Sequence, residues 1–187
     1  MRFGALFVSA FVVLGLSGCS GGQIEPAAAV LEEPAVLVAE PCELFSASDL
    51  ETIFGTEVRA GRNGISRIDD AAIEADSRHC RWSADVLDAS LQIAYGSDFD
   101  SGEFACLAPE DPRAVEADVG TRAWWSELTM AGSTLGRLRV CTTSSLVDIT
   151  IVGNVDADFS AGQVELGSKL RSQAELMGAV TLFRIDR

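Results

Sequence analysis

Five cysteines constrain what this chain of 187 residues can fold into more than any other feature. Cys19 stands alone at the end of an apolar N-terminal segment, whereas Cys42, Cys80, Cys106 and Cys141 are spread over the remainder. Hydrophobic residues make up 48% of the chain, which is enough to build the core of one domain of ordinary size. The cysteines therefore raise two separate questions, one about the N-terminal segment and one about the domain.

The N-terminal segment, residues 1–18, has the layout of a secretory signal peptide. Arg2 is followed by an apolar run from Phe3 to Leu16 that contains no acid and is shorter than the roughly 20 residues of a membrane-spanning helix. The sequence Leu16-Ser17-Gly18-Cys19 resembles the lipobox of bacterial lipoprotein signals. This resemblance implies that a diacylglycerol is attached to the Cys19 sulfur and that the chain is cleaved before it, the alternative being an ordinary cleaved signal.

We therefore expect an exported protein, anchored by acyl chains such as palmitate to the outer face of the cytoplasmic membrane. The segment 19–40 mixes Gly, Pro, Ala and Glu without a clean period, as is typical of a flexible spacer. The folded domain is then expected over residues 41–187.

The four cysteines of the domain are even in number, and in an exported chain they predict two disulfides. Four cysteines allow three connectivities, of which the sequential one, Cys42 with Cys80 and Cys106 with Cys141, is the simplest choice. Four buried free thiols are the alternative. Metal ligation is disfavoured because the chain contains no Cys-x-x-Cys pair.

The local patterns predict helices at both ends of the domain. Ser46 and Asp49 have capping-box spacing before an apolar stripe that ends at Gly55, which predicts a helix over 47–54. Residues 160–177 place apolar and small residues at helical spacing, which predicts a second helix. Its expected buried stripe consists of Val164, Gly167, Leu170, Ala174 and Met177.

Strand patterns occupy the middle of the domain. Apolar residues alternate over 80–84 and 91–95, which predicts a hairpin through residues 85–89, and three further strands are predicted over 121–130, 134–142 and 146–153. The polar stretch 60–77 is expected to be a long connection. Together these patterns predict the α+β class: a single antiparallel sheet of about five or more strands with N-terminal and C-terminal helices packed against it.

Two short motifs carry a resemblance to a known family. Pro41-Cys42-Glu43-Leu44 and, further on, Cys80-Arg81-Trp82 resemble the Pro-Cys-x-Leu and Cys-x-Trp motifs of small actinobacterial envelope lipoproteins, a family of uncharacterised function. The resemblance implies a disulfide between Cys42 and Cys80 and a location in the cell envelope of a mycobacterium or a related organism. It names no catalytic residue.

Composition and motifs exclude several functions. With 14 basic and 28 acidic residues the formal net charge is -14, which argues against binding of nucleic acid. The single histidine, His79, lacks a Gly-x-Ser-x-Gly nucleophile motif anywhere in the chain. We expect no cofactor and no catalytic residue.

One acidic segment has the spacing of a calcium-binding loop. Asn154, Asp156, Asp158 and Glu165 fall at positions one, three, five and twelve of an EF-hand-like pattern, but Phe159 stands where that loop needs glycine. A polar turn before the last helix is the alternative interpretation, so these residues are weak candidates and no metal is expected.

Adjacent tryptophans suggest a binding surface. Trp124 and Trp125 must point to opposite faces of a strand, so that either a second layer covers both or one of them is exposed. An exposed Trp125 beside Arg122, and near Arg137 and Arg139, would suit a protein partner or an anionic or glycan ligand. The leading hypothesis is a non-enzymatic domain that binds an envelope protein or a small ligand. The alternative is an enzyme or accessory factor that acts on cell-wall or lipid substrates.

Overall fold

The computed structural model describes residues 40–70, 73–130, 132–154 and 162–185, which all belong to one compact unit, Leu37–Arg187. The expected signal peptide, Cys19 and the spacer up to residue 39 lie outside the described residues. Asp156 and Asp158 of the calcium hypothesis also lie outside them.

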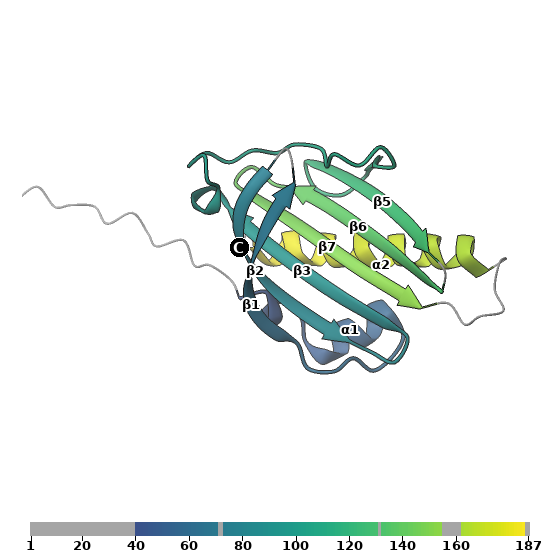
Figure 1. The fold of residues 1–187 in the computed structure, drawn as a ribbon. Coiled ribbons are helices and arrows are strands. Elements are labelled where there is room, and N and C mark those ends of the chain that lie inside the picture. Colours follow the sequence, from purple (N-terminus) through teal and green to yellow (C-terminus); the bar gives the residue numbers. More distant parts are fainter. Residues whose placement is uncertain (1–39, 71–72, 131, 155–161, 186–187) are drawn as a thin grey trace, which may run out of the picture. The chain divides into compact units, whose positions relative to one another are not determined.

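A seven-stranded sheet in the order β1-β2-β3-β7-β6-β5-β4 forms the centre of the domain, and every neighbouring pair is antiparallel (Figure 1). The prediction of an α+β domain with a single antiparallel sheet is therefore confirmed. The strands are β1 (Arg62–Asp70), β2 (Ile73–Ser83), β3 (Leu87–Tyr95), β4 (Val115–Ala117), β5 (Arg122–Met130), β6 (Ser133–Cys141) and β7 (Ser145–Asn154).

The segment 60–77 is not a connection, as its composition had suggested. It contains β1 and the first half of β2, and the turn of the next hairpin lies between Ser83 and Leu87. β1 is an edge strand in which only Ile68 is buried, so the alternation of apolar and polar residues that marks the other strands is absent. A strand that buries so little resembles a loop in composition.

Helix α2 (Gly162–Ile185) packs against β6 and β7 and covers one face of the sheet, here called the helix face (Figure 1). Leu170, Ala174 and Met177 are buried there as predicted, but Val164 is 78% exposed. The helix also continues past residue 177, where Gly178 and Thr181 extend the buried stripe by another turn.

The helix face receives the alternate apolar side chains of the central strands. Trp125 lies in this core, packed so closely on Gly136 that a Cβ at residue 136 would collide with the indole ring. The glycine thus makes room for the tryptophan. The strand residues of this core include Leu91, Ile93, Leu138, Val140, Val147, Ile149 and Ile151.

Helix α1 (Ala47–Phe54) follows the short 3-10 helix η1 (Pro41–Leu44). The Ser46 hydroxyl accepts a hydrogen bond from the Asp49 backbone N–H (3.1 Å), and the Asp49 carboxylate accepts one from the Ser46 N–H (2.9 Å). Gly55 ends the helix with φ of 69°, in the left-handed region that glycine favours. Its buried residues, Leu50, Ile53 and Phe54, join the core of the helix face.

The opposite face of the sheet, here called the loop face, is half covered. The covering segment, residues 96–114, contains the 3-10 helix η2 (Gly96–Asp98) and connects β3 to β4. Its Phe99, with Phe104 and Cys106 beside it, packs on a second apolar cluster of the sheet. The sheet residues of that cluster are Ile68, Ile73, Ala75, Ala94, Trp124, Cys141 and Leu146.

Two disulfides brace these layers. Cys42 pairs with Cys80 and joins η1 to β2, with Cα atoms 5.0 Å apart. Cys106 pairs with Cys141 and joins the covering segment to β6, with Cα atoms 5.8 Å apart. Each bridge therefore attaches a non-sheet element to a sheet strand, one on each face.

Candidate functional site

The half of the loop face that the covering segment leaves free is the candidate site, here called the open platform. Because side chains of an antiparallel sheet meet in cross-strand rows, the register decides which residues lie side by side. Across the sheet from β1 to β6 the loop-face side chains of the platform are exposed or half-buried, whereas Ser126 on β5 is buried and interacts with Asp111 of the covering segment. The rows of the platform contain arginines, hydroxyl residues and exposed apolar residues, drawn from all strands except β4.

One cross-strand row, here called the arginine–hydroxyl row, runs across six strands. Each member lies directly opposite the next in the strand register. Three members are arginines, three carry hydroxyls, and none is acidic. In order from β1 to β5 they are Arg62, Arg81, Ser90, Thr150, Arg137 and Ser126. The row therefore concentrates positive charge and hydrogen-bond donors in a chain of net charge -14.

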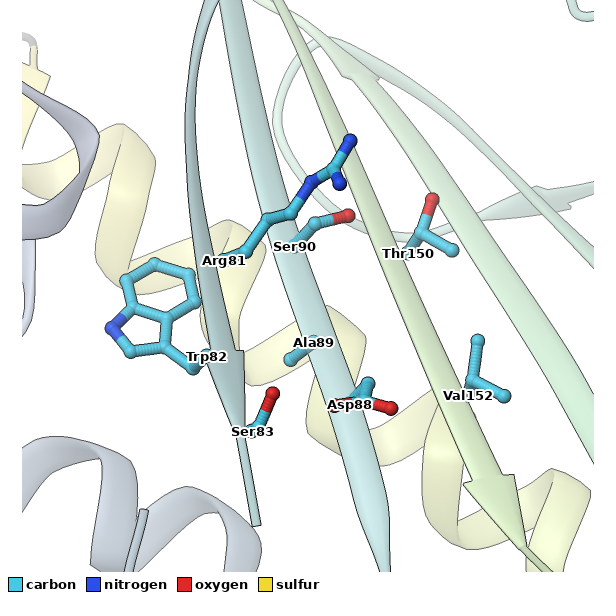
Figure 2. Close-up of a pocket in the computed structure, with 8 residues that line it drawn as sticks. All are labelled: Arg81, Trp82, Ser83, Asp88, Ala89, Ser90, Thr150 and Val152. Carbon is cyan, nitrogen blue, oxygen red and sulfur yellow. The ribbon is translucent and has the colours of Figure 1, made fainter. Parts of the chain in front are cut away.

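A pocket of about 400 Å³ lies over the middle of this row, between β2, β3 and β7. Figure 2 shows the Arg81 side chain extending from β2 across β3 and past Ser90, whereas Trp82 points away toward the helices. Thr150 and Val152 enter the same pocket from β7, and Asp88 enters it from β3. Adjacent strands thus supply cationic, anionic, hydroxyl and apolar side chains to the same pocket.

A second pocket of about 410 Å³ adjoins the first at Arg81 and Ser83 and extends toward β1. Arg59 and Arg62 line it together with His79. Arg59 forms an ion pair with Asp85 (3.5 Å), but in the described part of the chain Arg62 and Arg81 make neither an ion pair nor a side-chain hydrogen bond. Two unneutralised arginines therefore lie directly opposite each other.

An apolar row lies beside the arginine–hydroxyl row. Val152, Leu135 and Leu128 are register partners on β7, β6 and β5, and Leu135 and Leu128 are 38% and 36% exposed. Asp88 faces Val152 from β3 and is itself exposed. The platform thus has an apolar corner toward β5 and a cationic side toward β1.

Buried ion pairs support the platform from the covered half. The Asp148 carboxylate accepts hydrogen bonds from Nε and Nη2 of Arg139 (both 3.0 Å) and forms a further ion pair with Arg137. Burial alone would raise the pKa of Asp148, but the hydrogen bonds and charge of Arg139, with those of Arg137, outweigh it and lower that pKa. Asp70 adds a second ion pair to Arg139. Arg137 is thereby positioned at the boundary between the covered half and the platform.

His79 lies in the cross-strand row next to the arginine–hydroxyl row, opposite Gly64, and its imidazole lies against the backbone of that glycine. Burial, and then the charge of Arg81, lower its pKa. Its Nδ1 atom is buried, and no hydrogen-bond partner for it occurs among the residues described. No hydroxyl or carboxylate of that part of the chain is therefore placed to form a catalytic triad through this nitrogen.

The binding residues predicted from the sequence are not brought together on one surface. Trp125 is 4% exposed and lies on the helix face, and Trp124 is 8% exposed, so of the two alternatives both tryptophans are covered and neither is an exposed binding residue. Arg139 is fully buried, and Arg122 lies over the Trp124 ring, 5.1 Å from its centroid. Only Arg137 takes part in the open platform.

The calcium hypothesis gains no support from the residues that the structure describes. Asn154 ends β7 and Glu165 lies in the first turn of α2, and both are exposed. In the described ranges no group of three or more His, Cys, Asp or Glu side chains is arranged to hold a metal ion.

Arg62, Arg81, Ser90 and Thr150 were not recognised in the sequence. The first lies in the stretch interpreted as a connection, and the row itself depends on strand order and register. One available signal is that Arg81, Ser90 and Thr150 each occupy a polar position that alternates with buried residues of their strands. That alternation places each side chain on the loop face but does not show that they are neighbours.

Comparison with known proteins finds no matching family model, no matching curated protein and no matching solved structure. Within the described ranges, neither α1 nor α2 combines the length and the apolar character that crossing a membrane requires. The site is therefore interpreted from its own geometry and chemistry.

Proposed function

We propose that this protein is a lipid-anchored, non-enzymatic binding protein of the bacterial cell envelope, and that the open platform is its binding surface. The observation that carries the proposal is the arginine–hydroxyl row, whose members from Arg62 to Arg137 are exposed or half-buried and whose middle lines a pocket of about 400 Å³. Two arginines without an ion pair in the described ranges, the hydroxyls of Ser90 and Thr150, and exposed leucines lie together on one sheet surface, as is characteristic of recognition.

The anchoring part of the proposal rests on the sequence. The apolar segment that ends in Leu16-Ser17-Gly18-Cys19 supports export and lipid attachment at Cys19. Two paired disulfides are consistent with an oxidising compartment. The resemblance of the Pro41-Cys42-Glu43-Leu44 and Cys80-Arg81-Trp82 motifs to actinobacterial envelope lipoproteins supports the same location.

We further infer that the two faces of the sheet have different roles. The helices at either end of the domain serve as the cover of the helix face, and their buried side chains contribute to its core. The open half of the loop face is left for binding, because the apolar cluster beneath the covering segment includes no member of the arginine–hydroxyl row.

Photo-crosslinking in cells tests the proposal. A photoreactive amino acid replaces Val152 on the platform in one variant and Leu176, 46% exposed on α2, in a matched control. We expect a discrete adduct, identified by mass spectrometry, from position 152 and none in common with position 176. Equal, nonspecific adducts from both positions would remove the platform as the binding surface.

A further inference from the structure

We propose that the open platform binds an anionic amphiphile, with the acidic head group between Arg81 and Arg137 above the hydroxyls of Ser90 and Thr150. This inference rests on the proposed function, since it names the ligand class of the same surface. The ligand is a single amphiphile molecule whose head is an oxyanion, such as a phosphate ester or a carboxylate.

The charges of the platform call for an anion. Arg62 and Arg81 are direct cross-strand partners, and like charges in that position destabilise a sheet. Acidic residues outnumber basic ones two to one in the chain, yet none lies in the arginine–hydroxyl row. A bound oxyanion would relieve this repulsion and would form charge-assisted hydrogen bonds, which are about twice as strong as neutral ones.

The geometry favours the middle of the row. Arg81 and Arg137 are separated by three strand spacings, roughly 14 Å at about 4.8 Å per spacing, so both side chains must lean inward to reach one head group. Figure 2 shows Arg81 already leaning across β3 past Ser90. Arg137 is held from the other side by its ion pair with Asp148. The hydroxyls of Ser90 and Thr150 make no hydrogen bond within the described residues and can donate to the head group.

The neighbouring apolar row would bind the hydrocarbon chain of the ligand. Side chains two residues apart on one strand are separated by roughly 6.6 Å, so Val152 and Leu135 lie next to the head-group position. Leu128 and Met130, which is 61% exposed, continue the apolar surface toward the end of β5. An acyl or alkyl chain that starts at the head group would cover these residues.

Asp88 determines the orientation in which the amphiphile binds. Its exposed carboxylate lies at the β3 end of the apolar row, beside Ser90 in the same pocket, and repels an oxyanion there. The head group is therefore displaced toward β7 and Arg137, and the chain extends toward β5. A polar neutral ligand would experience no such bias.

Titration with three soluble compounds tests the inference. The full chain carrying Cys19→Ala, which has no lipid of its own to compete, is titrated by calorimetry with dodecyl phosphate below its micelle concentration. Dodecyl maltoside and inorganic phosphate serve as the uncharged and the chainless comparison. We expect dodecyl phosphate to bind at least about tenfold more tightly than either, because only it uses both rows.

Variants locate the head group. Arg81→Gln is expected to weaken dodecyl phosphate binding about tenfold, Thr150→Val to weaken it severalfold, and Asp88→Asn to strengthen it about threefold. Arg171→Gln on α2, which lies on the other side of the sheet, is the matched control and should leave binding unchanged. Arg81 and Asp88 are exposed, so neither change threatens folding.

The outcomes separate this inference from the proposed function. Equal affinity for dodecyl phosphate and dodecyl maltoside, or an unchanged affinity of Arg81→Gln, would overturn the anionic amphiphile, while a specific crosslink from position 152 would still support a binding surface. Recruitment by phosphatidylglycerol vesicles without any binding of dodecyl phosphate would also overturn it, in favour of an intact bilayer. Absence of both the crosslink and the titration signal would remove both proposals.

Discussion

At the scale of single residues, the Arg139–Asp148 pair is the least replaceable interaction described. Arg139 is fully buried and the Asp148 side chain is 3% exposed, so each charge depends on the other for the solvation that it loses on folding. Such a pair adds little net stability compared with apolar residues of the same volume. It becomes costly when only one partner is removed, because the remaining charge is buried alone.

Asp148→Asn should therefore destabilise the domain by about 3–5 kcal/mol, since the Arg139 guanidinium would lose its main counter-charge. The measurement is urea denaturation at pH 7 followed by circular dichroism. Asp88→Asn, which changes an exposed carboxylate on the far side of the arginine–hydroxyl row, is the control and should stay within about 0.5 kcal/mol of the unchanged protein. A similar effect of the two substitutions would contradict the assigned role of the pair.

The same pair predicts a pH dependence. The pKa of Asp148 is lowered on folding, so its stabilising contribution is complete above the unfolded-state pKa of about 3.9 and is lost as the pH falls toward the folded-state pKa. The difference in unfolding free energy between the unchanged protein and Asp148→Asn should narrow below about pH 4. A difference that stays constant from pH 7 to pH 3 would show that Asp148 is not the titrating group.

At the scale of elements, the helices are tied together by Arg184 in the last turn of α2. It donates a hydrogen bond to the Asp49 carboxylate (2.9 Å) and another to the Leu44 carbonyl, and its guanidinium lies 5.6 Å from the Phe45 ring centroid. The hydrogen bond from Arg184, followed by those from Ser46, lowers the pKa of Asp49. One side chain thus connects η1, α1 and α2.

Arg184→Gln should cost about 1 kcal/mol of stability, a value limited by the third of each side chain that remains exposed to solvent. A double-mutant cycle with Asp49→Asn should give a coupling free energy of about 0.5–1 kcal/mol. Arg171→Gln, which removes only an exposed pair with Glu175, is the control and should change stability by less than about 0.5 kcal/mol. Strict additivity of the two substitutions would disprove the connection.

The covering segment depends on the Cys106–Cys141 bridge. Replacing both cysteines by serine should cost about 2–4 kcal/mol and should speed amide hydrogen exchange in residues 96–114 more than in α2. Replacing Cys42 and Cys80 instead should affect η1 and leave the covering segment protected. If both double substitutions loosened the same region, the bridges would not act on separate elements.

The elements that could be predicted from the sequence are those that bury one regular face. Alternation predicted β5, β6 and β7 to within a residue or two, because apolar side chains at every second position, such as Leu138, Val140 and Ile149, point into the core of the helix face. β1 was missed because an edge strand with one buried residue leaves no periodic signal. The platform was missed for a different reason: neighbours such as Ser90 and Thr150 are set by strand order, which no local pattern encodes.

At the scale of the whole molecule, charge is distributed unevenly. The chain carries -14 overall, yet on the uncovered half of one sheet face Arg62 and Arg81 make no ion pair within the described residues. If Cys19 anchors the protein as proposed, the net negative charge keeps the domain away from anionic head groups while the platform can still accept a single anionic molecule.

Cys19→Ala tests the anchor. The unchanged protein should sediment with the membrane fraction and should carry the mass of attached acyl chains, whereas the variant should lose both properties. Ser17→Thr, a neighbouring substitution that leaves the cysteine in place, is the control and should remain acylated. Membrane association of Cys19→Ala equal to that of the unchanged protein would exclude lipid attachment at this residue.

The strand order also has a kinetic consequence. The sheet consists of a three-stranded meander, β1-β2-β3, and a four-stranded meander, β4-β5-β6-β7, whose internal pairings are all between chain neighbours. Only the β3–β7 pairing closes a long loop, and loop closure is the slow, entropically costly step. The two halves can therefore form early as separate hairpin units, and their meeting along β3 and β7 completes the arginine–hydroxyl row by placing Ser90 beside Thr150. The ability to bind the ligand should therefore appear late in refolding, when β3 pairs with β7, and not when the first hairpins form.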